Sequence, residues 1–217
     1  MGTHSSIKEY SAFEEKLNIS SHALGFFLSV IALILLNLRS FQYGNAWHIT
    51  SFAIFGASLI ALYATSTIYH HAKDPVLRKR LRILDHSAIY VLIAGTYTPF
   101  TLVTLNGPTG WTIFAVTWTM ALTGIVLKLY FTGRYDKLST AMYIFMGWVI
   151  IFAIQPLIDS LSSEGLFWLV SGGVAYTVGA ILYGIKQIKF NHAIFHTFVL
   201  AGSACHFIAV YLYVLPA

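Results

Sequence analysis

Three histidines stand at the ends of long apolar segments, where an ionisable side chain is unusual. His70 closes one segment, while His192 and His196 open another with H-x-x-x-H spacing, which puts both rings on one helical face. An imidazole in hydrocarbon is costly without a partner, so these residues are candidates for a function. If the two helices meet, three neutral imidazoles bind a metal ion and leave a fourth position for water, as catalytic zinc sites do.

Three further polar residues are expected near these histidines. Asp85 opens the third apolar segment and His22 opens the first. Ser66 lies four residues before His70 on the same helical face, so its hydroxyl can support the site by hydrogen bonding. Each residue also has a simpler interpretation, because histidines at helix ends often contact lipid headgroups and an aspartate at a helix start often caps it. His206, about 15 Å further along its helix than the pair, is too distant to share a metal ion with it.

The composition is that of an integral membrane protein with a single domain, residues 1–217. Of the 217 residues, 57% are hydrophobic and 10% are charged, whereas a soluble domain carries about 25% charged residues. The lone Cys205 excludes an internal disulfide framework. Basic residues are scattered over the loops, which argues against a nucleic-acid partner.

Seven apolar segments are each close to the roughly 20 residues that cross a bilayer core. They cover residues 21–39, 47–70, 83–105, 110–131, 138–157, 165–186 and 193–215. The sequence therefore predicts an all-α bundle of seven transmembrane helices. Pro99 lies inside the third segment and is expected to kink it.

Lys and Arg fix the predicted orientation of this bundle. Twelve of the 13 lie in the N-terminal tail or in and around the loops after the second, fourth and sixth segments, and only Arg39 lies on the other side. Because basic residues favour the cytoplasm, we expect the N-terminus inside and the C-terminus outside. Five polar residues from four of the segments then fall at one depth, near the inner leaflet: His22, His70, Asp85, His192 and His196.

Residues 1–20 form a polar segment before the first span. Ile7, Tyr10, Phe13 and Leu17 recur at helical spacing, which predicts a short amphipathic helix on the inner membrane surface. The segment lacks a basic stretch followed by a short apolar core, so no cleavable signal peptide is expected.

Several longer motifs follow one another along nearly the whole chain. They are residues 14–18 (EEKLN), 21–25 (SHALG), 66–70 (STIYH), 85–90 (DHSAIY), 94–100 (AGTYTPF) and 191–196 (NHAIFH), with His206 downstream. Together they resemble the hemolysin III group of the progestin and adipoQ receptor superfamily. The resemblance implies a seven-helix fold with the N-terminus inside. The short tails are similar to those of bacterial members, which implies a multi-pass protein of a bacterial inner (plasma) membrane.

The resemblance also implies a metal centre. In the related adiponectin receptors, zinc is held by the histidine of an S-x-x-x-H motif and by both histidines of an H-x-x-x-H motif. Here these are His70, His192 and His196, which implies one zinc ion per chain with water as the fourth ligand. In those receptors the aspartate that opens the third helix contacts the zinc-bound water, and the resemblance implies the same role for Asp85. Relatives include ceramidases, the receptors are reported to cleave ceramide, and bacterial members were named for lysing red cells and have been linked to lipid homeostasis.

Three functions are consistent with these residues. The first is zinc-dependent hydrolysis of a membrane lipid amide or another acyl lipid, with Asp85 as general base and acid, Ser66 orienting it, and His22 nearby. The second is a non-enzymatic sensor of membrane state in which zinc is structural. The third is a membrane-lytic or transport protein, which is supported poorly because no predicted helix carries a polar stripe through the bilayer. The sequence leaves open the substrate, the choice of metal and the oligomeric state.

Overall fold

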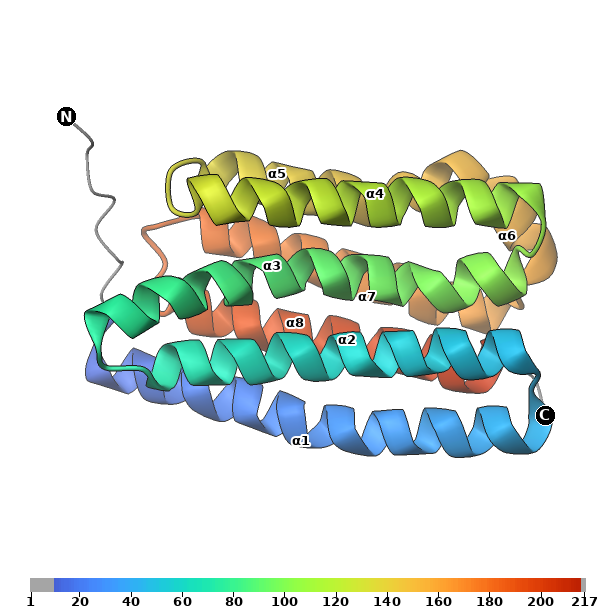
Figure 1. The fold of residues 1–217 in the computed structure, drawn as a ribbon, viewed down its shortest axis with the longest axis horizontal. Helices are drawn as coiled ribbons and strands as arrows, with labels where there is room; N and C mark the ends of the chain where they lie inside the picture. The colour runs from blue at the N-terminus through green and yellow to red at the C-terminus, as the bar shows by residue number, and fades with distance from the viewer. Residues whose placement is uncertain (1–9, 216–217) are drawn as a thin grey trace.

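Seven helices in the computed structural model, which describes residues 10–215, are long and apolar enough to cross a membrane. They run side by side along the long axis of one bundle (Figure 1). None of the described residues forms a strand. The predicted all-α bundle of seven membrane helices is therefore confirmed.

Most of the predicted segments match a helix, and the differences are concentrated in the first, third and fifth spans. The helices are α1 (Ala12–Tyr43), α2 (Ala46–His71), α3 (Pro75–Pro99), α4 (Pro108–Phe131), α5 (Asp136–Gly147), α6 (Ile154–Ser160), α7 (Ser163–Gly184) and α8 (Asn191–Ala209). Turns of other helical geometry extend or join them at Phe100–Thr104 after α3, Val149–Ala153 between α5 and α6, and Val210–Val214 after α8. Pro99 ends α3, and the backbone changes to a π-helical turn directly after it, since proline offers no N–H donor.

The first span is longer than predicted, because the expected surface helix is part of it. Helix α1 is unbroken over 32 residues and begins at the cap of Ser11, whose side chain accepts a hydrogen bond from the Glu14 N–H. No glycine or proline interrupts residues 12–24, so the helix continues straight into the apolar segment. Of the residues that predicted a separate amphipathic helix, Ile7 lies outside the described residues and Tyr10 precedes α1.

The third span also starts earlier than predicted, and this changes the environment of Asp85. Helix α3 begins at Pro75, and Asp74 caps it by accepting a hydrogen bond from the Leu77 N–H at 2.7 Å. Asp85 lies ten residues later, about 15 Å along the helix, and is buried. The expectation that Asp85 opens the helix is therefore wrong. Hydropathy misses this start because the first turns of α3 are basic, whereas the aspartate cap and the following proline favour a helix there.

The fifth span, predicted as one helix, is broken in the middle. Helix α5 ends at Gly147, and a 3-10 turn leads into α6. The hydroxyl of Tyr97, from α3, donates to the Gly147 carbonyl at 2.8 Å and accepts the Ile150 N–H at 3.0 Å. The indole N–H of Trp148 donates to Thr177 on α7. These bonds satisfy polar groups that a break would otherwise leave without partners in the membrane.

Replacing Tyr97 by phenylalanine should therefore destabilise the protein. The substitution removes only the hydroxyl and leaves the Gly147 carbonyl and the Ile150 N–H without it, which costs about 1–3 kcal/mol. The measurement is the free energy of unfolding in detergent micelles. Tyr130→Phe is the matched control, because Tyr130 is 77% exposed and should change the free energy by less than about 0.5 kcal/mol. Equal changes in the two variants would mean that contacts other than the Tyr97 hydroxyl stabilise the break between α5 and α6.

The arrangement of the helices brings the predicted site residues to one end of the bundle. Helix α1 packs against α2, α2 packs against α3, and α8 packs against both α7 and α1. The end of α2 and the beginnings of α1, α3 and α8 all lie at the left of Figure 1. His70 at the end of α2 thus meets His192 and His196 in the first turns of α8.

Candidate metal centre

The three predicted histidines form one buried cluster. One ring nitrogen of each of His70, His192 and His196 lies within 4.8 Å of the others. The Nε2 atoms of His70 and His192 are 3.0 Å apart. No other group of three or more metal-binding side chains comes this close within the part of the chain that the structure describes. The cluster joins α2 and α8, which are far apart in sequence, so the condition that these two helices meet is fulfilled.

The geometry of this cluster fits a tetrahedral metal ion. Zinc–nitrogen bonds of about 2.0–2.1 Å place two tetrahedral ligands about 3.3 Å apart, close to the separation of the His70 and His192 nitrogens. Ser21 donates its hydroxyl proton to the Asn18 carbonyl, so its oxygen, 3.4 Å from His196 Nδ1, accepts from that nitrogen. This arrangement leaves the Nε2 lone pair of His196 available for a metal ion. Three neutral imidazoles suit zinc and several other transition metals.

Two residues near the start of α1 contact the Nδ1 atom of His70, the ring nitrogen that does not face His192. Glu15 accepts a hydrogen bond from His70 Nδ1 at 2.7 Å, and Asn18 Nδ2 lies 3.5 Å from the same nitrogen. Both residues lie within the EEKLN motif, and neither was predicted from the sequence to have a role at the site. Their signal was present in the spacing, because Glu15, Asn18 and His22 are three and four residues apart and therefore share one helical face.

His22 and Tyr10 pack directly on the histidine cluster. The ring of His22 is buried and stacks on His196, with centroids 3.5 Å apart and planes at 14°. The ring of Tyr10 stacks on His192 with centroids 4.9 Å apart. Burial raises the pKa of the Tyr10 hydroxyl above its usual value. Tyr10 was predicted to belong to a surface helix, and it instead covers the cluster at the end of the bundle.

Asp85 and Ser66 lie in the wall of a cavity that borders the histidine cluster. Both residues line it together with His22, His192 and His196. Ser66 lies one turn before His70 on α2 and next to Asp85, which comes from α3. The structure therefore brings a buried carboxylate and a hydroxyl to the same cavity as two of the clustered histidines.

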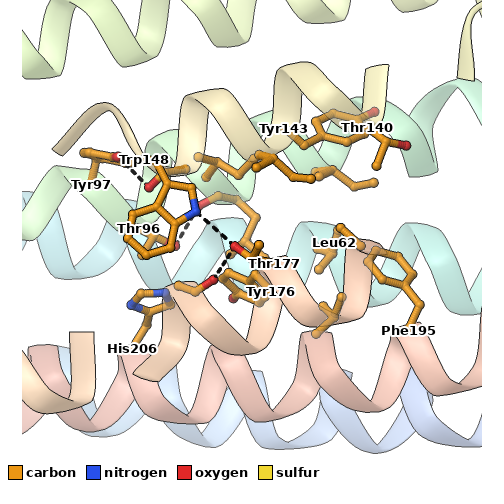
Figure 2. Close-up of a pocket in the computed structure, with 18 of the residues that line it drawn as sticks. Leu62, Thr96, Tyr97, Thr140, Tyr143, Trp148, Tyr176, Thr177, Phe195 and His206 are labelled. Carbon is orange, nitrogen blue, oxygen red and sulfur yellow. Dashed lines mark hydrogen bonds between the residues drawn. The ribbon is translucent and has the colours of Figure 1, made fainter. Parts of the chain in front are cut away.

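The cavity continues far along the bundle and is largely apolar. Its volume is about 210 Å³, and its wall on α3 runs from Asp85 to Phe100, a distance of about 22 Å at the helical rise. Figure 2 shows Leu62 and Phe195 in one part of the wall and Trp148, bonded to Thr177, in another. An elongated apolar molecule with one reactive polar group matches a cavity of this shape.

His206 lies at a second polar place in the same cavity wall. It is buried beside the ring of Tyr176, with centroids 5.3 Å apart, and the Tyr176 hydroxyl bonds to Ser203 at 2.9 Å. Ser203 also accepts a hydrogen bond from Tyr63 at 2.8 Å. A Cβ at Gly172 would come within 2.6 Å of the His206 ring, so a larger residue there would force that ring to move. His206 is not part of the three-histidine cluster, in agreement with its spacing.

The fold and the cluster define a multi-pass membrane protein with a buried three-histidine group at one end of a seven-helix bundle. The chain belongs to the Haemolysin-III related family, whose model matches residues 10–207. Hemolysin-3 from Bacillus cereus is 49% identical over 203 residues, which cover 94% of this chain and 93% of that protein.

More distant relatives extend the similarity to eukaryotes. Monocyte to macrophage differentiation factor from Homo sapiens is 27% identical over 212 residues, covering 94% of this chain and 85% of that protein. An ADIPOR-like receptor from Saccharomyces cerevisiae is 26% identical over 249 residues, covering 94% of this chain and 76% of that protein. The family and superfamily predicted from the motifs are confirmed.

Proposed function

We propose that this protein is a zinc-dependent hydrolase of membrane lipids that carry an amide-linked or otherwise linked acyl chain. The observation that supports it most is the position of the histidine cluster at one end of an apolar cavity whose wall also carries Asp85. His70, His192 and His196 would hold one zinc ion per chain and leave one position for water. Bound zinc polarises a carbonyl and makes water nucleophilic at neutral pH.

Side chains of the protein would carry out the proton transfer and hold the reacting groups in position. The carboxylate of Asp85 accepts the proton of the attacking water and then returns it to the leaving nitrogen or oxygen, the ordinary work of a general base and acid. Ser66 lies next to Asp85 in the cavity wall, and its hydroxyl would orient that carboxylate by donating a hydrogen bond to it. His22 fixes His196 by ring stacking. Burial of these residues excludes bulk water, which strengthens their electrostatic interactions with the reacting groups.

The proposed substrate follows from the dimensions and polarity of the cavity. A cavity wall of about 22 Å exceeds half of the roughly 30 Å hydrocarbon core, so it is long enough for an acyl chain that occupies one leaflet. Its walls are mostly aliphatic and aromatic. A lipid whose linkage lies at the histidines and whose chain fills the cavity meets both conditions. Ceramide is the simplest amide of this kind.

The proposal also includes the orientation of the protein. With twelve of 13 basic residues in the N-terminal tail or in and around the loops after α2, α4 and α7, the cluster faces the cytoplasmic leaflet. The bacterial plasma membrane is the corresponding location, in line with the Bacillus relative. The orientation is tested by adding a cysteine after Ala217 and treating intact cells with a membrane-impermeant thiol reagent. We expect this cysteine to be labelled, and protection from the reagent would show the opposite orientation.

The activity is tested with purified protein in liposomes. Protein with about one zinc ion per chain is reconstituted with ceramide, and released fatty acid is measured with and without a zinc chelator. Chelator-sensitive release supports the proposal. Protein that takes up no zinc when it is supplied, or zinc-loaded protein that releases no fatty acid from ceramide or from other acyl lipids, contradicts it.

A structural role for the metal ion is the second candidate, and one observation favours it. The ligands come from α2 and α8, and His70 and His192 are 122 residues apart in sequence, so a bound ion would tie distant helices together. The protein would then respond to the membrane without turning over a lipid. Chelation that lowers the unfolding midpoint, combined with no hydrolysis of any lipid tested, would favour this function.

Lysis is the third candidate because of the name of the Bacillus cereus relative, Hemolysin-3. The described cavity is lined mostly by apolar side chains and offers ions no continuous polar path. We therefore expect dye-filled liposomes with the protein to release dye no faster than empty liposomes, before any lipid is cleaved. Release that persists in a His70→Ala variant would instead identify a lytic protein.

A further inference from the structure

Glu15 connects three helices behind the histidine cluster. One carboxylate oxygen, Oε2, accepts the hydrogen bond from His70 Nδ1 at 2.7 Å. The other oxygen, Oε1, accepts from the guanidinium of Arg78 in the first turns of α3. The Glu15 side chain is 16% exposed, so these contacts are largely shielded from water. A carboxylate held on both oxygens in this way has a fixed position relative to His70.

This contact determines which nitrogen of His70 carries the proton. An ionised carboxylate only accepts hydrogen bonds, so the Nδ1 atom that faces Glu15 is protonated. A neutral imidazole has a single N–H, and the lone pair of His70 therefore lies on Nε2. Nε2 is the atom that lies 3.0 Å from His192 Nε2, on the inner side of the cluster.

Asn18 offers the opposite arrangement and is the weaker partner. If its amide donated to His70 Nδ1, the proton would move to Nε2 and block that nitrogen as a metal ligand. The Asn18 distance is 3.5 Å, against 2.7 Å for Glu15. A charge-assisted hydrogen bond of the shorter length is the stronger of the two. Glu15 therefore decides the tautomer.

Arg78 in turn holds Glu15 in place. Its guanidinium lies over the ring of Tyr69 at 5.1 Å and also donates to the Ala72 carbonyl at 3.4 Å. These contacts fix the guanidinium at the junction of α2 and α3. The positive charge of Arg78 balances the Glu15 carboxylate, which favours the ionised form that accepts a hydrogen bond from His70.

We propose that Glu15 is a positioning residue of the metal centre: it fixes the tautomer and orientation of His70, and Arg78 fixes Glu15. This inference rests on the proposed zinc function, because it assigns a partner to one of the proposed ligands. Carboxylate partners of this kind typically contribute 10–100-fold to metal affinity. Neither Glu15 nor Arg78 belonged to the site predicted from the sequence.

The test is the zinc affinity of the full-length protein in detergent, measured by competition with a chelator. Glu15→Gln should bind zinc about 10–100-fold more weakly than the wild type. Glu14→Gln is the matched control, since it removes a carboxylate one residue away on a different helical face, and it should bind as the wild type does. Arg78→Gln keeps the carboxylate but releases it, so a smaller loss in the same direction is expected. This variant also serves if Glu15→Gln does not fold.

A second measurement separates positioning from a general effect on folding. Nitrogen-15 chemical shifts of labelled histidine report the tautomer in zinc-free protein. The wild type should show His70 protonated on Nδ1, and Glu15→Gln should shift the population toward Nε2. Unchanged affinity together with an unchanged tautomer in Glu15→Gln would overturn the inference. A wild type that binds no zinc would overturn the proposed function instead, and the tautomer measurement would remain informative about Glu15.

Discussion

Replacing His196 by alanine is expected to remove the bound metal ion almost completely. Wild-type protein should carry about one zinc ion per chain after purification, and the variant less than about a tenth of that, because two imidazoles do not complete the three-ligand set of an open zinc site. His196 is 2% exposed and lies between His22 and the other two histidines, so solvent does not readily replace its ring. The measurement is zinc and protein content by elemental analysis, with His70→Ala expected to behave in the same way.

His206→Ala is the control for this prediction. His206 is on the same helix, is also buried and lines the same cavity, yet it lies outside the cluster. This variant should keep about one zinc ion per chain. If it lost zinc to the same extent as His196→Ala, disturbed packing of α8 would explain both results and the three-histidine site would be contradicted. Helical content by circular dichroism shows which variants remain folded.

The bundle and the cluster were predictable because each depends on local patterns. Apolar segments of membrane-spanning length identify the seven helices, and the H-x-x-x-H spacing fixes His192 and His196 on one face. His70 could be added because helix direction places the end of α2 and the start of α8 at one end of the bundle. Alternating helix direction accounts for that shared end, whereas the sequence left contact between the two helices open, and the three-histidine ligand set was implied by the family resemblance.

The parts that the sequence did not predict depend on contacts between distant residues. The break in the fifth span lies in an apolar stretch, and its stabilising group is the Tyr97 hydroxyl from α3. The role of Glu15 requires the knowledge that α1 starts at Ala12 and passes beside His70. Asp85 was placed at a helix start because hydropathy rejects the basic turns that precede it. Hydropathy measures local apolar content and carries no information on such partners.

Replacing Asp85 by asparagine is expected to separate metal binding from turnover. The side chain keeps its size, and Asp85 is not among the three clustered ligands, so the variant should hold about as much zinc as the wild type. An amide does not accept the proton of the attacking water. Loss of a general acid and base typically lowers the rate about 10²–10⁴-fold, and we expect fatty-acid release in liposomes to fall by that factor.

Asp74→Asn provides the matched control on the same helix. Asp74 caps α3 about 16 Å from Asp85, and asparagine caps a helix about as well, so both stability and lipid turnover should stay close to wild type. Full turnover by Asp85→Asn with zinc still bound would contradict the role of Asp85 and require another proton acceptor in the cavity. Loss of turnover together with loss of zinc would show that Asp85 acts on the metal centre itself, as part of its support. Only retained zinc with lost turnover assigns the proton transfer to Asp85.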